Sequence, residues 1–392
     1  MVALAAPFSI HPMQPAIGRI PDRSLRSVCN HARHSRGMRC GQGNLAIPAH
    51  ALPHSPCMPS RTDSRDLIVL RPEGLYCPAG DFHIDPWRPV PRAVITHGHG
   101  DHARIGMGQY HCSLQSLPIL RWRLGEQAYR AHDYGEAFEL GRAQVSLHSA
   151  GHVLGSAQVR VEVDGEVWVA SGDYKRQHDP TCAPFEVVPC DTFITEATFG
   201  LPVYRWPETA EVAREIADWR RDCGERGEAA LLYCYALGKA QRVLAELLPF
   251  DDQPALLHGA IAAGVEVYRQ SGVAMLETRL VADEEKGADF AGKLVMAPPS
   301  AAGSPWIRRF KRAQQGFASG WMRIRGNRRR RNYDRGFVVS DHADWPDLFR
   351  TVKETGARRV IATHGNTDAI IRALQEQGIA AEAFRTDYGG EE

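Results

Sequence analysis

Apolar and polar positions follow a clear pattern only beyond the first 65 residues. From there, short apolar runs alternate with Gly, Pro and Asp, which is typical of strands joined by turns. Residues 66–70 are the first predicted strand. Residues 158–163 and 166–170 predict a β-hairpin, because the Asp164-Gly165 pair between them suits a tight turn with positive φ.

Helical spacing of apolar residues begins in the middle of the chain. Residues 208–221 and 239–248 predict helices, and strands and helices then alternate. Nearer the end, residues 337–340 and 360–363 predict strands, and residues 345–355 predict a helix between them. The sequence therefore predicts a mixed α/β (α+β) fold, and its 392 residues are enough for two domains.

Residues 1–65 differ in composition from the rest of the chain. They contain eight Arg and eight Pro but only two Asp, and neither Glu nor Lys. A segment without a sustained apolar period cannot bury enough surface to offset the entropy lost on ordering it. We therefore expect an unstructured leader, or a start site placed too far upstream, and assign its histidines no ligand role. Organelle import signals are also Arg-rich and acid-poor, but the Pro content disfavours their amphipathic helix.

The overall composition excludes few classes of protein. The formal net charge of +1 neither requires nor excludes a nucleic-acid partner, so the distribution of charge matters more. The nine Cys have no paired spacing, which favours reduced thiols in the cytoplasm over a disulfide framework. No run of about eighteen uncharged apolar residues occurs, so the sequence predicts no membrane span.

The strongest chemical signal follows a predicted strand at residues 93–96. This strand runs directly into the sequence His97-Gly-His99-Gly-Asp101-His102. Imidazoles two residues apart on an extended chain point the same way, so His97 and His99 can hold one metal ion while Asp101 and His102 turn toward a second. The intervening glycines let the backbone bend between ligands. A His-rich surface loop is the alternative, and the dense ligand spacing directly after an apolar strand disfavours it.

Further ligand-type residues stand where other predicted strands end. His152, Asp173 and His364 each follow an apolar run and lie beside a Gly. Each alone is equally compatible with a capping or core role, but their shared pattern favours a common metal centre. A carboxylate at Asp173 could bridge two ions. Asp85 is expected to orient a ligand histidine from behind.

The order of these residues resembles the motif series of the metallo-β-lactamase superfamily. The fold of that superfamily is a four-layered αββα sandwich, which the resemblance implies for this chain. The matching residues, in order, are Asp85, His97, His99, Asp101, His102, His152 and Asp173.

The β-CASP nucleases, which process DNA and RNA, resemble this chain more specifically. The segments around Glu196, His342 and His364 are similar to motifs A, B and C of that group, which carries an α/β domain inserted before the last ligand. The segments beginning at Ala297, Phe317 and Arg335 are similar to bacterial ligase-associated DNA exonucleases. The implied domains are the leader at 1–65, the first metallo-β-lactamase part at 66–202, the inserted β-CASP domain at 203–335 and the last part at 336–392.

The resemblance also implies residue roles. The ligands implied for one zinc ion are His97, His99, His152 and Asp173, and those for a second are Asp101, His102, Asp173 and His364. Mn²⁺ is an alternative occupant of the second site. The residues implied in catalysis are Asp85, Asp101, Glu196 and His342. In this scheme His342, paired with Glu196, protonates the leaving oxygen after water activated by the ions attacks phosphorus.

The implied activity is zinc-dependent hydrolysis of phosphodiester bonds in DNA by an exonuclease of DNA repair. Association with an ATP-dependent DNA ligase and a helicase rests on the same resemblance alone. RNA processing is the alternative, because the sequence has no feature that tests for a 2′-hydroxyl. A small-molecule ester or thioester hydrolase of this fold would not need Glu196, His342 or the insert. A catalytically dead binding subunit is expected to lack ligands, and none is missing.

Positive charge concentrates in the implied insert. Such clusters attract phosphates whatever the base sequence, although charge runs are also common on solvated faces. The helix start at residues 235–242 suits a phosphate or is an ordinary helix start. Trp306, Phe310 and Trp321 stack on bases or pack the insert. The cluster comprises Arg308, Arg309, Lys311, Arg312, Arg323, Arg325 and Arg328 to Arg331, and the predicted nucleic-acid contacts are Lys239, Arg242, Arg308, Arg309, Arg328 and Arg329.

Deletion of residues 1–65 should leave folding and catalytic activity nearly unchanged, because the segment contains no predicted core element or ligand strand. Thermal melting and activity of the shortened chain, compared with the full chain, test this expectation. A large drop in melting temperature would show that the segment contributes to the fold.

Overall fold

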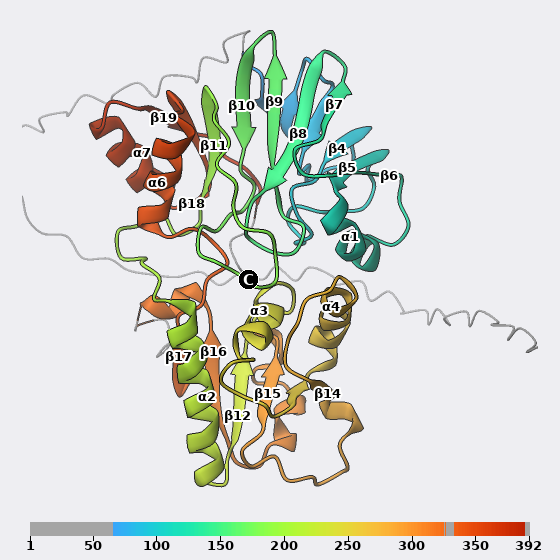
Figure 1. The fold of residues 1–392 in the computed structure, drawn as a ribbon, viewed down its shortest axis with the longest axis vertical. Coiled ribbons are helices and arrows are strands. Elements are labelled where there is room, and N and C mark those ends of the chain that lie inside the picture. The colour runs from blue at the N-terminus through green and yellow to red at the C-terminus, as the bar shows by residue number, and fades with distance from the viewer. Residues whose placement is uncertain (1–65, 325, 327–332, 389–392) are drawn as a thin grey trace, which may run out of the picture. The chain divides into compact units, whose positions relative to one another are not determined.

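The computed structural model describes residues 66–324, 326 and 333–388. The predicted leader, residues 1–65, lies outside the described residues. The described strands form three sheets, which Figure 1 shows together with the helices that cover them. No helix among the described residues is long and apolar enough to cross a bilayer.

The first sheet comes from the beginning of the described chain. In spatial order its strands are β1 (Val69–Arg71), β2 (Gly74–Cys77), β3 (Phe82–Ile84), β4 (Arg92–Val94), β5 (Gln109–Ser113) and β6 (Tyr129–His132). Strands β1 to β3 are antiparallel, and β3 to β6 are parallel. The 3-10 helix η1 (Leu114–Ser116) and helix α1 (Leu117–Leu124) connect β5 to β6.

The second sheet combines strands from both sides of the central region. In spatial order they are β19 (Ala380–Ala383), β18 (Arg359–Gly365), β11 (Thr192–Ala197), β10 (Glu166–Ala170), β9 (Ala157–Val163), β8 (Ala143–Ser149) and β7 (Ala137–Leu140). Strands β10, β11, β18 and β19 run parallel, and β7 to β10 are antiparallel. Helices α6 (Trp345–Thr355) and α7 (Thr367–Glu376) flank β18 in the chain.

Alternation along single strands shows how the layers stack. Phe193 of β11 packs with residues of α6 and α7, whereas its neighbour Ile194 packs in the core that also holds Phe82 of the first sheet. On the far face of the first sheet, Tyr110 packs against Leu120 of α1. The layers are therefore helix, sheet, sheet and helix, which confirms the αββα sandwich expected from the sequence.

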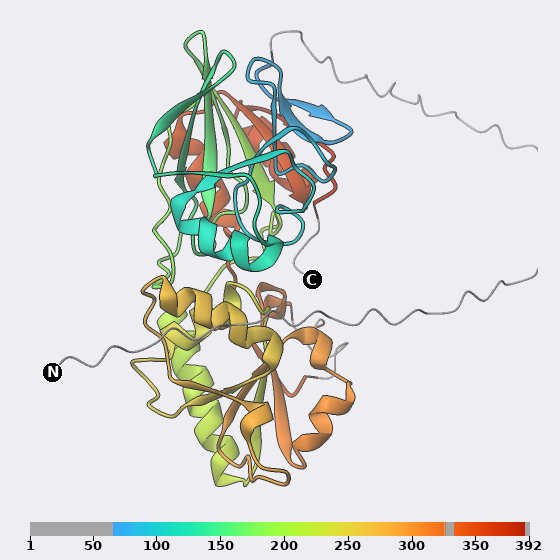
Figure 2. The ribbon, with the colours of Figure 1, turned by 90° about the vertical axis from the view of Figure 1, so that its right-hand side faces the viewer.

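The third sheet comes from the central region and is parallel throughout its described strands. In spatial order the strands are β14 (Thr278–Leu280), β13 (Ala255–Leu257), β15 (Leu294–Ala297), β12 (Ala229–Tyr233), β16 (Ala313–Ala318) and β17 (Arg335–Phe337). Helices α2 (Thr209–Glu225), α3 (Lys239–Glu246) and α4 (Gly259–Gln270) pack on one face (Figure 2). Segments with short 3-10 helices cover the other, namely η2 (Val281–Asp283), η3 (Pro299–Ala301), η4 (Pro305–Arg309) and η5 (Gly320–Arg323).

Two local predictions have opposite outcomes. The predicted hairpin is confirmed as β9 and β10, with φ values of 51° at Asp164 and 86° at Gly165. The prediction of a strand at 337–340 is wrong beyond its first residue. Strand β17 ends at Phe337 and pairs with β16 in the third sheet, whereas the Ser340 carbonyl accepts a hydrogen bond from the Arg242 side chain instead of a neighbouring strand.

The hairpin turn provides a test of the backbone argument. Gly165→Ala should lower the free energy of unfolding by about 1–2 kcal/mol, because the left-handed region is unfavourable for a residue with a Cβ. A Cβ at Gly165 or at Gly259 would meet no atom within 4 Å, but only Gly165 has a positive φ. Gly259→Ala, in the first turn of α4, is therefore the matched control and should lose no stability. Equal losses in urea denaturation would contradict this explanation.

Candidate metal centre

The candidate ligands stand at strand ends and in the loops that follow. Strands β10, β11 and β18 are parallel neighbours, so their carboxyl ends meet at one edge of the second sheet. Asp173 follows β10, while Glu196 and His364 lie near the ends of β11 and β18. His152 follows β8, and the loop that begins at His97 follows β4 of the first sheet. The two packed sheets thus bring residues distant in sequence to one place.

One compact set has the dimensions of a zinc site. It consists of His97, His99, His152 and Asp173. Nε2 of His97 and Nε2 of His152 each lie 3.1 Å from Nδ1 of His99. The same two nitrogens lie 3.5 and 3.7 Å from Oδ2 of Asp173. Because zinc–nitrogen bonds are about 2.0–2.1 Å, a tetrahedral ion separates its ligand atoms by about 3.3 Å, which the observed distances bracket.

Hydrogen bonds to backbone carbonyls fix the protons on two of these rings. A carbonyl can only accept, so Nε2–H of His99 donates to Leu237 at 3.2 Å and Nδ1–H of His152 donates to Asp341 at 2.7 Å. Burial lowers the pKa of both imidazoles, so both are neutral. A neutral ring carries one N–H, and the nitrogens that face each other, Nδ1 of His99 and Nε2 of His152, are therefore lone pairs.

The third ring of the set follows the same rule. The Thr96 hydroxyl donates its proton to Oδ2 of Asp85 at 2.5 Å and accepts from Nδ1–H of His97 at 3.0 Å. Burial lowers the pKa of His97, which is also neutral, so its Nε2 is a lone pair. Three lone pairs thus converge beside the Asp173 carboxylate. A metal cation satisfies all of them together, whereas a single proton cannot.

A second set shares the Asp173 carboxylate and contains His102 and His364. Nδ1–H of His102 donates to Asp85 at 2.8 Å, which turns Nε2 toward Asp173. Nε2 of both rings and Oδ1 of Asp173 are buried without a hydrogen-bond partner, although His364 Nε2 and Asp173 Oδ1 lie only 3.0 Å apart. Burial opposes the charge on His102, but surrounding carboxylates, Asp173 foremost, outweigh it and raise its pKa to about 10. The position therefore attracts positive charge, as a metal site does.

Asp101 is more peripheral than the other predicted ligands. Its Oδ2 lies 3.6 Å from Nε2 of His102, and its side chain is 26% exposed. It belongs to none of the compact sets found among the described residues. The assignment of Asp101 to the second ion stays a prediction.

The Glu196 carboxylate and the His342 ring form a buried pair beside these sets. Nδ1 of His342 lies 2.8 Å from Oε2 of Glu196, and Oε1 of Glu196 accepts from the backbone N–H of Tyr174 at 2.7 Å. Ligand-type atoms of Glu196, His342 and Asp173 lie within 4.8 Å of one another. The pair is thus adjacent to the shared carboxylate.

Known proteins with similar sequences carry names of nucleic-acid enzymes. A probable DNA ligase from Opitutus terrae is 31% identical over 318 residues, which cover 80% of this chain and 31% of that protein. An RNase J-like protein from Methanocaldococcus jannaschii is 24% identical over 200 residues, 45% of this chain and 48% of that protein. The endoribonuclease YSH1 of Eremothecium gossypii is 30% identical over 125 residues, 31% of this chain and 16% of that protein. This chain therefore spans less than half the length of each.

The chain belongs to the β-CASP group of the metallo-β-lactamase superfamily. No protein-family profile matches it. A solved structure of a protein of unknown function from Enterococcus faecalis superposes on this β-CASP protein with a TM-score of 0.52 and 11% identity, covering 76% of this chain and 79% of that chain. At this identity the likeness shows the fold alone.

The predicted nucleic-acid contacts of this β-CASP protein divide into three kinds. Lys239 and Arg242 have side chains that are 0% and 1% exposed and form ion pairs with Asp341, so the prediction that they contact a phosphate is corrected: they are buried structural cations. Arg308 and Arg309 are exposed in η4. The remaining contacts, Arg328 and Arg329, and the neighbouring Arg325, Arg330 and Arg331 lie outside the described residues.

The aromatic residues that lie among these cations in the sequence contribute to the core of the inserted region, the part of the chain between β11 and β18 that forms the third sheet. Phe310 is buried in the core on the outer face of the third sheet, and Trp306 and Trp321 pack against that core. The Trp306 and Phe310 ring centroids are 4.9 Å apart. Packing therefore accounts for these residues better than base stacking does.

Tyr388 is a site neighbour that the sequence did not reveal. Its ring stacks on His102 with centroids 4.6 Å apart and an interplanar angle of 7°, and its edge contact with His364 spans 5.6 Å. The residue lines a small cavity beside Asp85 and Thr96. It lies in a polar stretch beyond the last strand, and no periodicity or motif marks it.

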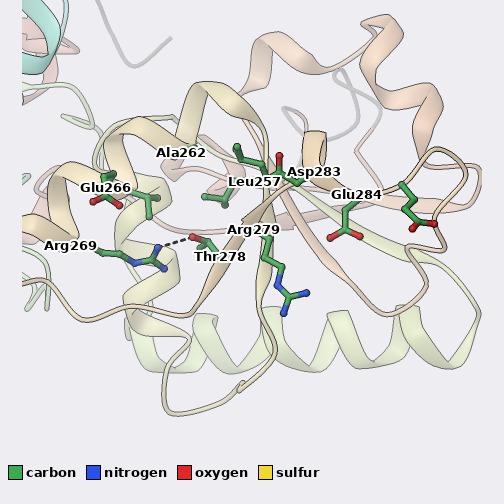
Figure 3. A pocket seen from close by; sticks show the side chains of 11 residues that line it. Leu257, Ala262, Glu266, Arg269, Thr278, Arg279, Asp283 and Glu284 are labelled. Carbon is green, nitrogen blue, oxygen red and sulfur yellow. Dashed lines mark hydrogen bonds between the residues drawn. The ribbon is translucent and has the colours of Figure 1, made fainter. Parts of the chain in front are cut away.

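The inserted region also has a wide cleft, of about 600 Å³, between α4 and the edge strand β14 (Figure 3). Charges of both signs line it, including Glu266, Arg279 and Glu284, and Arg269 donates to Thr278 at 2.9 Å. None of the predicted site residues that the structure describes lines this cleft. The metal centre is instead closely packed.

We expect about two divalent ions per chain when the protein is purified without chelator, because the Asp173 carboxylate belongs to two ligand sets. His364→Ala should retain about one, since it removes a ligand from the second set only. His148→Ala is the matched control, because His148 bonds Ser146 and Glu186 and belongs to no ligand set. Elemental analysis measures the number of metal ions per chain in the parent protein and in both variants. One ion or none in the zinc-supplemented parent protein would contradict the paired centre.

Proposed function

We propose that this β-CASP protein is a zinc-dependent nuclease that hydrolyses phosphodiester bonds of DNA, as an exonuclease in DNA repair. The observation that carries the proposal is the shared position of Asp173. Its carboxylate belongs to both histidine sets and also adjoins the Glu196–His342 pair. Cleavage of a phosphodiester needs charge neutralisation and a proton donor at adjacent points, and this arrangement supports both.

The described residues fit two metal ions, which we propose to be zinc. The ligands proposed for the first are His97, His99, His152 and Asp173, and those proposed for the second are Asp101, His102, Asp173 and His364. Mn²⁺ is an alternative at the second position, which is richer in carboxylate. When bound, the ions neutralise charge on phosphate oxygens and make water acidic enough to attack near neutral pH. Asp85 accepts the proton on Nδ1 of His102, so Nε2 is the nitrogen that would face the second ion.

The proposed proton donor to the leaving oxygen is His342. Glu196 accepts a hydrogen bond from its Nδ1 and would stabilise the charged, protonated imidazole. The Tyr174 backbone N–H holds the Glu196 carboxylate in turn, so the ring has little freedom to rotate. His342 thereby holds its proton at a defined point beside Asp173.

Charge and relatives support a nucleic-acid substrate. Exposed cations of the inserted region would attract the phosphate backbone, with an affinity that falls as salt rises. The described members of the predicted cluster, all exposed, are Arg308, Arg309, Lys311, Arg312 and Arg323. The region similar to this chain covers only 31% of the probable DNA ligase. In that relative, the region is therefore one part of a longer protein that carries the name of a DNA ligase. This favours DNA and a cytoplasmic association with an ATP-dependent DNA ligase, to which we add a helicase on the basis of family resemblance.

RNA processing is a second candidate, which the relatives named RNase J-like protein and endoribonuclease YSH1 favour. Digestion of end-labelled single- and double-stranded DNA and RNA, with and without a 5′-phosphate, separates the two. Preferential release of nucleotides from DNA ends supports the proposal. Cleavage of RNA but not DNA would support the RNA-processing function instead. Hydrolysis of acyl esters without any cleavage of nucleic acid would contradict the proposal that the protein is a nuclease.

His342→Ala should reduce turnover by roughly a hundredfold or more while both metal ions remain, as expected for loss of a general acid. Glu196→Gln should give a smaller loss in the same direction, because the ring keeps a hydrogen-bond partner but loses the compensating charge. Turnover and metal content are measured on the same preparations. If His342→Ala loses an ion and His364→Ala keeps both, the two histidines have exchanged roles.

A further inference from the structure

A cluster of buried charges lies directly behind the metal centre. Its members are Lys175, Asp179, Lys239, Arg242 and Asp341, whose side chains are all 4% exposed or less. The Asp341 carboxylate forms ion pairs with two cations of α3. Nζ of Lys239 lies 3.3 Å from its Oδ2, and Nη1 of Arg242 lies 3.3 Å from its Oδ1. Lys175 pairs with Asp179, which lies 3.5 Å from Nε of Arg242. The proposed mechanism uses none of these side chains.

Stability alone explains such a cluster poorly. Removing each charge from water costs several kcal/mol, and well-packed apolar residues often give equal or greater stability than a buried ion pair. A buried network does define positions well when its members are hydrogen-bonded, because few other arrangements satisfy them. The cluster therefore fixes the position of the groups that its members contact.

The backbone at residues 340–341 connects the cluster to the metal centre. Nη1 of Arg242 donates to the Ser340 carbonyl at 2.5 Å, while Nη2 binds the hydroxyl of Thr209 in α2 at 2.7 Å. The next carbonyl, that of Asp341, accepts the Nδ1 proton of His152 at 2.7 Å. The His152 ring thus donates to the peptide group directly after the one that Arg242 holds, and the residue between the two groups, Asp341, has its side chain held by both α3 cations.

His342 directly follows Asp341, so the peptide group that His152 contacts also fixes where the His342 backbone begins. Its backbone N–H donates to the Ser340 side chain at 3.2 Å. Both cations contact the Asp341 carboxylate, which is itself buried. The inserted region, through α3, therefore holds two site histidines from behind.

We propose that Asp341, held by Lys239 and Arg242, is a positioning residue that aims Nε2 of His152 at the first metal ion and places His342 beside Asp173. This inference rests on the proposed function, in which His152 is a metal ligand and His342 a proton donor. It gives the inserted region a second role besides contact with substrate. Loss of the carboxylate lets the peptide shift and the His152 ring turn.

Cobalt(II) titration of the metal-free full-length protein tests the proposal, because the visible spectrum of bound cobalt reports ligand geometry independently of turnover. Asp341→Asn should change this spectrum, raise the dissociation constant of the first ion about tenfold or more, and lower kcat by a similar factor with KM nearly constant. Arg242→Gln should shift the same readouts in the same direction, and Arg242→Lys, which keeps the charge, should recover part of the loss. If Asp341→Asn does not fold, the comparison of Arg242→Gln with Arg242→Lys tests the positioning role instead.

Asp251→Asn is the matched control. The Asp251 side chain is 1% exposed and pairs with Arg220 of α2 at 2.5 Å, and none of its described contacts involves a site residue. This variant should lose melting temperature like Asp341→Asn yet keep the parent cobalt spectrum and kcat. Parent-like spectra and dissociation constants in Asp341→Asn and Arg242→Gln would overturn the positioning role. If the parent binds cobalt but cleaves no nucleic acid, the proposed function fails while the spectral comparison still decides this inference.

Discussion

The direction of each imidazole proton is the constraint on which the metal centre depends. A neutral histidine has one N–H, and where the fold supplies an acceptor for it, the opposite nitrogen must be a lone pair. Here the acceptors are the Thr96 hydroxyl and the Leu237 and Asp341 carbonyls. They come from the first sheet, the inserted region and the segment after β17, so the lone pairs meet only when all three are in place.

The ligands themselves could be predicted from the sequence because each ends or follows a strand. Side chains there escape the alternation that assigns strand residues to a core face, and a polar residue next to Gly at such a point needs another explanation. His152, Asp173 and His364 share this position. The carbonyl acceptors had no such signal, since Leu237 and Asp341 contribute backbone atoms that any residue possesses.

Charge was the least reliable guide to position. Lys239 and Arg242 looked like phosphate contacts at a helix start, but the partner that makes their burial tolerable, Asp341, is 99 residues from Arg242 in sequence. The strand predicted at 337–340 failed for a related reason, because a tertiary hydrogen bond from Arg242 takes the Ser340 carbonyl. The hairpin at Asp164 was predictable because its turn depends only on neighbours in the chain.

The pairing of β11 with β18 has a consequence for folding. These neighbours are joined through the whole inserted region, from Ala197 to Arg359. Closing so long a loop costs chain entropy, and contacts of this separation form slowly, so an insert that has already become compact brings the two ends together at lower cost. During synthesis, His364 reaches β11 only after the third sheet has left the ribosome. A chain that has not yet paired β18 with β11 therefore cannot place His364 beside Asp173, so this candidate ligand set forms after that pairing.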